Sequence, residues 1–429
     1  MFGFANFLLL ALFAAAVFDL IFALARGGGL RGALHGLWNT PHLLFGQQLA
    51  EWRLQLGRIL FAAGLAAYEI SVVFCNSMAR QNWAWVQGVM SPVLEWLAFL
   101  CFGAKILFGT RYTWRELLAS GALYFIARWV YFNSQNIWWI GIVVAVLAAK
   151  DVPLRRPLQV YFASGCAAMA VVLALHFAGI VAPDLTSERM GALRGTYGYG
   201  HPNTFGGLVF GLVLAYALLR AQKVRWVDCL LVFAVGVFLL VGPASRSAAL
   251  CTLALAVGLV FCRLRAGHSV PRWWPGTCAG MVGLTAAVSY LLPLLVIKVG
   301  PWNNDIGPAW LAKLDSLLTC RISLTWMAYR LLDVKIAGQV FNWPTVDNSF
   351  AFALFQFGPV VAALLGILFA AALLGHAKQG RRVEVCCLFA MLAYAYMEVQ
   401  PFHLTTNPTA LLLCGAVFAQ TSARWQKIE

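Results

Sequence analysis

Charged residues are scarce in this chain. Asp, Glu, Lys and Arg make up only 11% of its 429 residues, against about 25% in an average soluble domain. Hydrophobic residues make up 62%, which is more apolar surface than a soluble fold of this length could bury. The shortage of charge therefore excludes an ordinary soluble protein and indicates that lipid covers much of the surface.

Metal and nucleotide motifs are also absent from the sequence. The eleven cysteines are scattered, most of them inside apolar runs, with no C-x-x-C pair and no metal-type spacing. There is no P-loop, no dinucleotide fingerprint and no separate soluble catalytic domain. We expect no metal, no cofactor and no disulfide framework, so any chemistry must use the membrane domain and its outer loops.

Thirteen apolar segments are candidate transmembrane helices, since several approach the ~20 residues that cross a bilayer. They lie at 4–24, 58–78, 85–104, 116–133, 137–149, 158–181, 203–220, 226–242, 247–262, 275–297, 348–375, 384–399 and 406–421. The sequence therefore predicts an all-α polytopic membrane protein with about 12–13 transmembrane helices, in which 1–429 forms a single integral membrane domain.

The basic residues predict the orientation of these helices. The net charge is +15, and five short connections hold three basic residues each. These are Lys105, Arg111 and Arg115; Lys150, Arg155 and Arg156; Arg220, Lys223 and Arg225; Arg263, Arg265 and Arg272; and Lys378, Arg381 and Arg382. They alternate along the chain as one side of a membrane should, so the positive-inside rule makes that side cytoplasmic and explains the charge without a nucleic-acid partner. The segments 182–202, 243–246, 298–347 and 400–405 then face outward.

The longest outward loop, 298–347, has a helical pattern of its own. From Pro308 to Lys335 apolar residues recur at spacings of three or four, at Leu311, Leu314, Leu318, Ile322 and Trp326. The pattern predicts a helix that lies on the membrane surface or on the helix bundle.

A dense polar motif precedes one of the predicted spans. It runs Arg194-Gly195-Thr196-Tyr197-Gly198-Tyr199-Gly200-His201-Pro202-Asn203. Its glycines allow tight turns, and Asn203 is well placed to cap the next helix. A turn and a cap do not explain an arginine and a histidine at an apolar boundary, so we expect Arg194, Tyr197, His201 and Asn203 to bind substrate.

Further polar groups stand at the outward ends of the predicted helices. They are Arg246 in the turn 243–247, Arg321 and Arg330 in the long loop, Asp347, Asn348 and Ser349 where that loop re-enters the bilayer, and Glu398 followed by His403 and Asn407. The structural alternatives are that Arg246 snorkels to lipid headgroups and that Asn348 or Ser349 only caps a helix.

Together these groups indicate an anionic substrate. Arginine binds phosphate through a permanently charged, bidentate fork, and a pyrophosphate-linked lipid entering from the outer face fits a set of outward arginines. The same arginines would stabilise the departing pyrophosphate. Glu69 and Glu95 lie inside predicted spans and are the residues that would mark an ion path in a transporter, with Arg128 as a candidate partner for one of them.

The order of the motifs resembles that of a known superfamily over roughly residues 158–421. The run Gly198-Tyr199-Gly200-His201-Pro202-Asn203 is similar to the signature of Gram-positive exopolysaccharide and capsule polymerases. Ser245-Arg246, Arg321-x-x-Leu324-x-Trp326, Asp347-Asn348-Ser349 with Gly358, and Glu398 with Asn407-Pro408 follow in the order of the O-antigen polymerase and ligase superfamily.

The resemblance implies a metal-independent membrane glycosyltransferase with a GT-C-type fold. It implies that Arg246 and Arg321 bind the lipid pyrophosphate, and that donor and acceptor are undecaprenyl-pyrophosphate-linked oligosaccharides joined at the outer face of the cytoplasmic membrane. Asp347, or else His201 or Glu398, would assist the attacking hydroxyl as general base. Direct attack would invert the anomeric centre, and a flippase and a chain-length regulator are the expected protein partners.

Two alternatives differ from this reading. The ligase branch of the superfamily carries a histidine where this chain has Asp347, so the residue favours the polymerase branch. A transporter or flippase of the lipid-linked unit would need polar residues through the depth of the bilayer, whereas most polar groups here gather at the outer ends.

Overall fold

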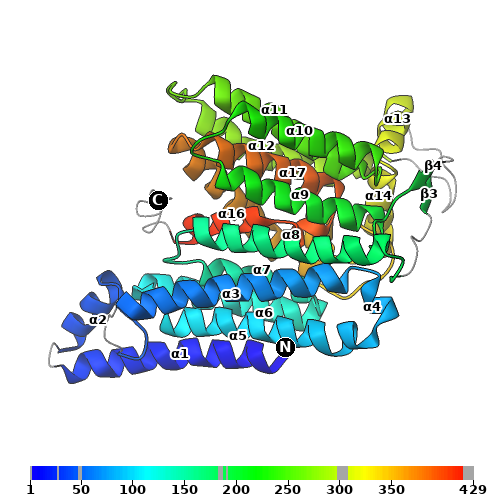
Figure 1. Ribbon diagram of the computed structural model, residues 1–429. Helices are drawn as coiled ribbons and strands as arrows, with labels where there is room; N and C mark the ends of the chain where they lie inside the picture. The colour runs from blue at the N-terminus through cyan, green and yellow to red at the C-terminus, as the bar shows by residue number, and fades with distance from the viewer. Residues whose placement is uncertain are drawn as a thin grey trace.

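The computed structural model describes residues 2–26, 29–46, 51–181, 187–189, 192–296 and 308–418, and these form a bundle of roughly aligned helices (Figure 1). Eight helical segments in the described ranges are long and apolar enough to cross a membrane: Gly3–Ala25, Glu51–Cys75, Val86–Phe108, Arg155–Phe177, Pro202–Leu219, Arg246–Leu264, Trp274–Leu295 and Pro359–Lys378. The chain is therefore an all-α, multi-pass membrane protein, as the sequence predicts.

The elements follow one another as a long series of helices with two very short strand pairs. The longer helices are α1 (Phe2–Ala25), α3 (Glu51–Cys75), α5 (Ser91–Phe108), α6 (Trp114–Ser134), α7 (Ile137–Ala148), α8 (Arg155–Phe177), α9 (Pro202–Leu219), α10 (Trp226–Val241), α11 (Arg246–Leu264), α12 (Trp274–Leu291), α16 (Pro359–Lys378) and α17 (Arg382–Met397). The shorter helices are α2 (Gly29–Asn39), α4 (Ala79–Asn82), α13 (Ala309–Leu317), α14 (Arg321–Leu331), α15 (Ser349–Phe352) and α18 (Cys414–Val417). Strand β1 (His42–Leu43) pairs with β2 (Arg111–Tyr112), and β3 (Ser187–Arg189) pairs with β4 (Ala192–Arg194), both antiparallel.

Two predicted spans are not continuous helices. The segment 348–375 consists of α15, a π-helical turn over Ala353–Phe357, and α16. The break falls at Gly358, whose φ of +87° suits glycine. An added Cβ there would collide with the backbone carbonyl of Ile336. The segment 406–421 begins with a 3₁₀ turn over Pro408–Leu413 and continues, as far as residue 418, with the single turn α18.

The predicted helix from Pro308 to Lys335 is also interrupted. It divides into α13 and α14 at Thr319 and Cys320, which both have positive φ values near +60°. The apolar stripe of the sequence still forms one cluster, because both helices pack it against Leu292 and Val296 at the end of α12. The stripe therefore faces the helix bundle.

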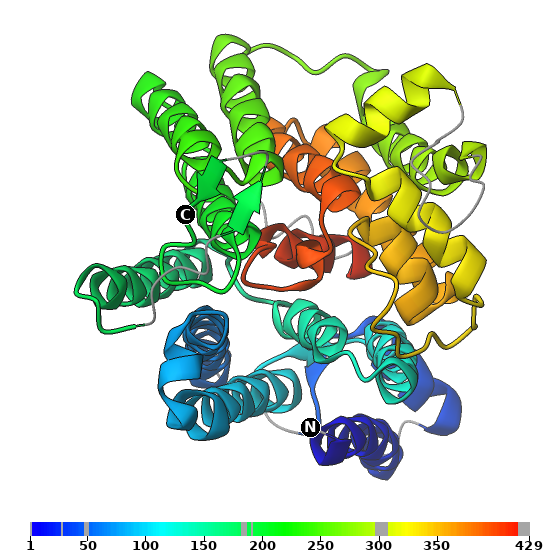
Figure 2. The same cartoon turned by 90° about the vertical axis from the view of Figure 1, so that its right-hand side faces the viewer.

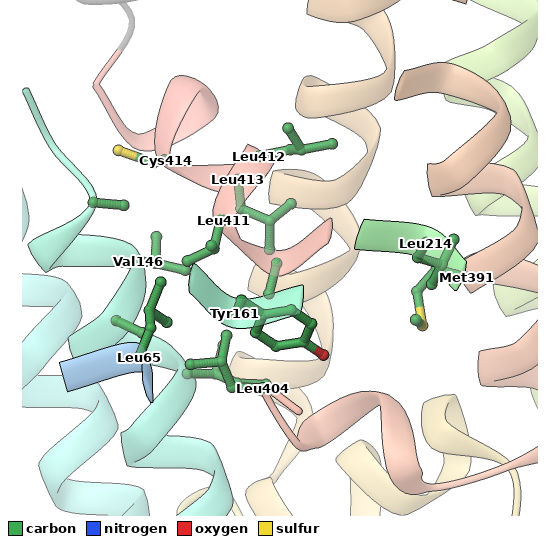
Figure 3. Close-up of a cluster of buried hydrophobic side chains, with 14 of the residues drawn as sticks. Leu65, Val146, Tyr161, Leu214, Met391, Leu404, Leu411, Leu412, Leu413 and Cys414 are labelled. Carbon is green, nitrogen blue, oxygen red and sulfur yellow. The ribbon is translucent and has the colours of Figure 1, made fainter. Parts of the chain in front are cut away.

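The centre of the molecule is filled by segments from both halves of the chain. Helix α7 is only twelve residues long, and its residues 139–148 are all buried, so it is a core helix covered by protein. Figure 3 shows Tyr161 of α8 between Leu404 and the C-terminal leucines Leu411 and Leu413, with Leu65 of α3 and Val146 of α7 on the other side of Leu411. The predicted count of about 12–13 spans therefore includes helices whose apolar sequence reflects burial inside the protein.

The outer helices present apolar side chains at the surface. On α10, Val227, Leu230 and Val241 are 69%, 67% and 76% exposed. Exposed apolar area of this extent is unfavourable in water and is expected where lipid covers the protein.

The basic connections lie at one end of the bundle, to the left in Figure 1. We call this the basic end. Lys150 Nζ lies 3.2 Å from Glu116 and links two of the connections, while Arg382 donates to the carbonyl of Arg265 and links two others. The alternation that the sequence predicts is thus present in space.

Helix α9 approaches its neighbours closely at two glycines. A Cβ added at Gly206 would lie 2.6 Å from the Cβ of Ser245, and one added at Gly207 would lie 2.8 Å from the hydroxyl oxygen of Tyr394. Gly206 and Gly207 therefore let the turn before α11 and helix α17 approach the start of α9.

We predict that Gly206→Ala destabilises the protein. Ser245 has a short, buried side chain and cannot move aside, so overpacking should cost about 1–3 kcal/mol and lower the apparent midpoint of thermal unfolding in detergent. Gly366→Ala in α16 is the matched control, since its added Cβ would meet no atom within 4 Å. Equal midpoints for the two variants would contradict this account of the contact.

Candidate functional site

Glu398 follows the last residue of α17 and accepts hydrogen bonds from three distant segments. Its Oε1 lies 3.0 Å from Asn203 Nδ2, 2.8 Å from Ser247 Oγ and 2.6 Å from Arg321 Nη2. The donors are 195, 151 and 77 residues away in sequence, and Glu398 is only 5% exposed. A buried carboxylate is stable only when paired and hydrogen-bonded, and these three contacts meet that need.

Arg194 joins the same network through Asn203. Its Nη2 donates to Asn203 Oδ1 at 2.9 Å and to the carbonyl of Ala244 at 3.2 Å. We refer to Arg194, Asn203, Ser247, Arg321 and Glu398 as the Glu398 cluster. It contains two arginines and one carboxyl group, so it has a surplus of positive charge.

The cluster lies at the end of the bundle opposite the basic end. Figure 2 looks onto this end and shows the chain from α13 through α14 to α15 lying across the bundle beside the ends of α12, α16 and α17. Four of the sequence motifs, although distributed from residue 194 to residue 398, therefore meet at one place, as their predicted common orientation requires.

Nearly all of the N–H donors of the Arg321 guanidinium form hydrogen bonds within the protein. The guanidinium donates through Nε to the carbonyl of Met397, through Nη1 to that of Leu318 at 2.9 Å, and through Nη2 to Ser247 and Glu398. These are four hydrogen bonds from a group with five N–H donors. Arg321 thus fixes the position of α14 relative to α11 and α17.

Asp315 positions the start of α14, where Arg321 lies, and no sequence pattern predicts this role. Its Oδ1 accepts from the backbone N–H groups of Ile322 and Ser323 at 2.8 and 3.1 Å, and its Oδ2 accepts from Ser323 Oγ at 2.9 Å. It therefore caps α14 from the preceding helix and does what the side chain of an N-cap residue usually does. Cys320 occupies the N-cap position without a side-chain hydrogen bond.

Arg246 lies at the same end of the bundle, but unlike Arg194 and Arg321 it is not bound by other described residues. It is the first residue of α11, beside Ser247 of the cluster, and it is exposed. Among the described residues it forms no hydrogen bond and no ion pair. Its guanidinium is therefore available to a ligand, and the first turn of α11 adds the unpaired N–H groups and positive dipole end of a helix N-terminus.

The remaining residues of the first motif serve the local fold. His201 caps α9, since its Nδ1 accepts from the backbone N–H of Asn203 at 3.1 Å. The prediction that Asn203 is the cap is therefore wrong, because Pro202 takes the first helical position and Asn203 turns towards Glu398. Tyr197 stacks on Phe205, with ring centroids 5.0 Å apart, and contacts Phe238.

The segment after the long loop contributes one acidic and two structural residues. Asn348 Oδ1 accepts from the N–H groups of Phe350 and Ala351 and so caps α15, one of the roles expected for it. Ser349 donates to the backbone carbonyl of Glu398. Asp347 is half-buried and lies close enough to Glu398 for their charges to interact.

Two predicted polar residues stand apart from the cluster. Arg330 is exposed near the end of α14, where its guanidinium lies 5.8 Å from the ring centroid of Trp326. Nine residues separate it from Arg321, or about 13.5 Å along a helix. His403 packs on Trp138, and burial lowers the pKa of His403 to about 3, so this histidine is neutral.

Among the described residues, Arg128 forms no ion pair with Glu69 or Glu95, the carboxylates inside the predicted spans. Arg128 Nε donates to Asn6 at 2.7 Å, and its guanidinium lies over Phe132. Glu69 is buried in α3 beside Gly165 of α8. Within the described ranges, no group of three or more His, Cys, Asp or Glu side chains is arranged to hold a metal ion.

Comparison of the chain with protein-family models, with curated protein sequences and with solved structures finds no match.

We predict that the pair Arg321–Glu398 is strongly coupled. Arg321→Met or Glu398→Met alone leaves a buried charge without its partner, which should cost about 3–5 kcal/mol. The double variant should cost clearly less than the sum of the two. The measurement is a double-mutant cycle on thermal or denaturant stability in detergent.

Arg330→Met is the control, because Arg330 is exposed on the same helix and should change stability by less than about 1 kcal/mol. Additive effects of the Arg321 and Glu398 variants would show that the two side chains act independently.

Proposed function

We propose that the chain is a polysaccharide polymerase that joins undecaprenyl-pyrophosphate-linked oligosaccharide repeat units at the outer face of the cytoplasmic membrane. The observation that carries the proposal is the meeting of four motif segments at the Glu398 cluster, with Arg246 exposed beside it. In this proposal the basic end faces the cytoplasm, following the positive-inside rule, and the fold is of the GT-C type.

Arg246 is the residue assigned to the pyrophosphate. Its guanidinium has no partner among the described residues, and arginine pairs with phosphate oxygens through two parallel hydrogen bonds. The N-terminus of α11 favours an anion at the same place. Arg321 is already bound by the protein, so its role is to hold α14 in place and to add positive charge behind the phosphate site.

Asp347 is the residue assigned to the acceptor. It is half-buried beside the cluster and has no hydrogen bond among the described residues. In the proposed reaction, a sugar hydroxyl of the acceptor attacks the anomeric carbon of the donor. The new carbon–oxygen bond forms as the bond to the lipid pyrophosphate breaks. The hydroxyl proton passes to Asp347, and the pyrophosphate lipid leaves as an anion held by Arg246.

An apolar cavity beside the cluster supports a lipid-linked substrate. Its volume is about 90 Å³, and its lining includes Tyr290, Ser349, Phe350, Ala362 and Gly366. The Ser349 hydroxyl donates a hydrogen bond to the backbone carbonyl of Glu398, so one side of the cavity borders the cluster. Its lining from α12 and α16 is suited to part of an isoprenoid chain close to the charged headgroup.

We predict that Arg246→Gln lowers polymer formation by about 10²-fold, the effect of removing one preorganised donor to a developing anion. Arg246→Lys should also lose most activity, because the charge remains but the bidentate fork is lost. The measurement is the length and amount of polymer made by purified protein from purified lipid-linked repeats.

The thermal stability of both Arg246 variants should equal that of the wild type, since the side chain makes no described contact. Arg272→Lys, at an exposed position of the basic end, is the matched control and should retain full activity. Polymer of normal length and amount from both Arg246 variants would remove Arg246 from the phosphate site.

We predict that Asp347→Asn binds the donor normally and polymerises about 10²-fold more slowly. The change removes the charge and keeps the shape, so single repeats should accumulate on the lipid. Asp347→His restores a basic group, recreates the residue of the ligase branch and should recover part of the activity.

Donor binding is measured beside the rate. Full activity of Asp347→Asn would exclude Asp347 as the base and leave His201 and Glu398 as the next candidates. Weaker donor binding with an unchanged rate at saturation would show that Asp347 only orients an arginine. Transfer of finished glycan to an acceptor other than a lipid-linked repeat would favour the ligase.

A further inference from the structure

A second cavity lies at the basic end, remote from the Glu398 cluster. Its volume is about 530 Å³, within the range of small-ligand sites. Three connections form its walls: 221–225 between α9 and α10, 262–266 at the end of α11, and 380–384 between α16 and α17. The packing of α9, α10, α11, α16 and α17 brings these connections together.

The lining of this cavity is strongly basic. It includes five cationic residues, and the only carboxylate in it is the buried Glu384. The five are Lys223, Arg225, Arg263, Arg381 and Arg382. The nearest other acidic residue of these connections, Asp228, is occupied by Arg220 at 3.1 Å. The cavity therefore has a surplus of positive charge.

Two of these cationic side chains are exposed and available to a ligand. The ammonium group of Lys223 and the guanidinium of Arg263 form no hydrogen bond or ion pair among the described residues. Arg382, in contrast, donates to the carbonyls of Arg265 and His268 and so ties two walls of the cavity together. The cavity therefore contains both a cation that holds its walls together and cations that are available to a ligand. The positive-inside rule requires basic residues at this end but does not require them to share a concavity.

The cavity borders the apolar surface of the bundle. Helix α10 starts directly after Arg225, and its residues Trp226, Val227 and Leu230 are 53%, 69% and 67% exposed. Tryptophan followed by exposed aliphatic side chains is typical of the membrane–water interface. A ligand with an anionic head and an apolar tail would therefore contact both surfaces at once.

We propose that this cavity binds the phosphate-bearing headgroup of an anionic phospholipid, with its acyl chains along α10. Free phosphate shares the same chemistry at the cations, but it leaves the adjoining apolar face of α10 without a role. Basic pockets between membrane helices suit such headgroups, and each Lys or Arg near the headgroup strengthens binding by roughly fivefold. The inference does not depend on the proposed polymerase activity.

The test uses the full chain in detergent with defined lipids. Native mass spectrometry should detect bound phosphatidylglycerol, and phosphatidylcholine with the same acyl chains should bind at least tenfold more weakly. The double variant Lys223→Gln/Arg263→Gln should bind phosphatidylglycerol about tenfold or more weakly than the wild type. Both side chains are exposed and unpartnered, so helix content by circular dichroism should not change.

The matched control is Arg155→Gln/Arg156→Gln, which removes two exposed arginines from the same end outside the cavity and should bind phosphatidylglycerol as the wild type does. Equal losses in the two double variants would show that only the overall charge of this end matters and would overturn the site. The absence of any preference for phosphatidylglycerol would do the same. Stabilisation by inorganic phosphate alone, without retained lipid, would assign the cations to a soluble phosphate and overturn the lipid proposal.

Discussion

The ion pair between Arg321 and Glu398, 2.6 Å long and almost entirely buried, is the interaction on which the rest of this structure depends. Two charges removed from water repay their desolvation only when geometry and further hydrogen bonds are good. Asn203 and Ser247 supply those bonds, and they stand at the starts of α9 and α11. One carboxylate therefore ties together the ends of α9, α11, α14 and α17.

This arrangement separates two kinds of arginine that look alike in the sequence. Arg194 and Arg321 are buried, and their hydrogen bonds are made to the protein. Arg246 stands one residue before Ser247, yet it is exposed and makes no described contact. Arg194 and Arg321 hold this end of the bundle together and make it positively charged, and the exposed Arg246 lies beside them. Preorganised charge of this kind is worth most where an anion must be held without moving the protein.

Hydropathy and charge were sufficient to predict the class of fold, the course of most helices and their alternation, because lipid exposure and basic connections leave strong local patterns. They could not predict that α7 is a buried core helix, since a core and a bilayer select the same residues. The site residues were found because arginine and carboxylate are rare at apolar boundaries. Their roles could not be predicted, because the partners of Glu398 are 77 to 195 residues away in the sequence. The capping of α14 by Asp315 also follows no local motif. Pro202 likewise moved the cap of α9 from Asn203 to His201.

Glu398 comes after its cluster partners in the sequence, and this order has a consequence for biogenesis. Ribosomes complete Arg194, Asn203, Ser247 and Arg321 before the carboxylate that joins them exists, so the partly made protein contains Arg321 without its anion. Synthesis of α17 and Glu398 supplies that anion. A nascent chain that stops before Glu398 keeps Arg321 without this carboxylate. The charge pairing at this end of the bundle is therefore completed only after all the partner segments have been made.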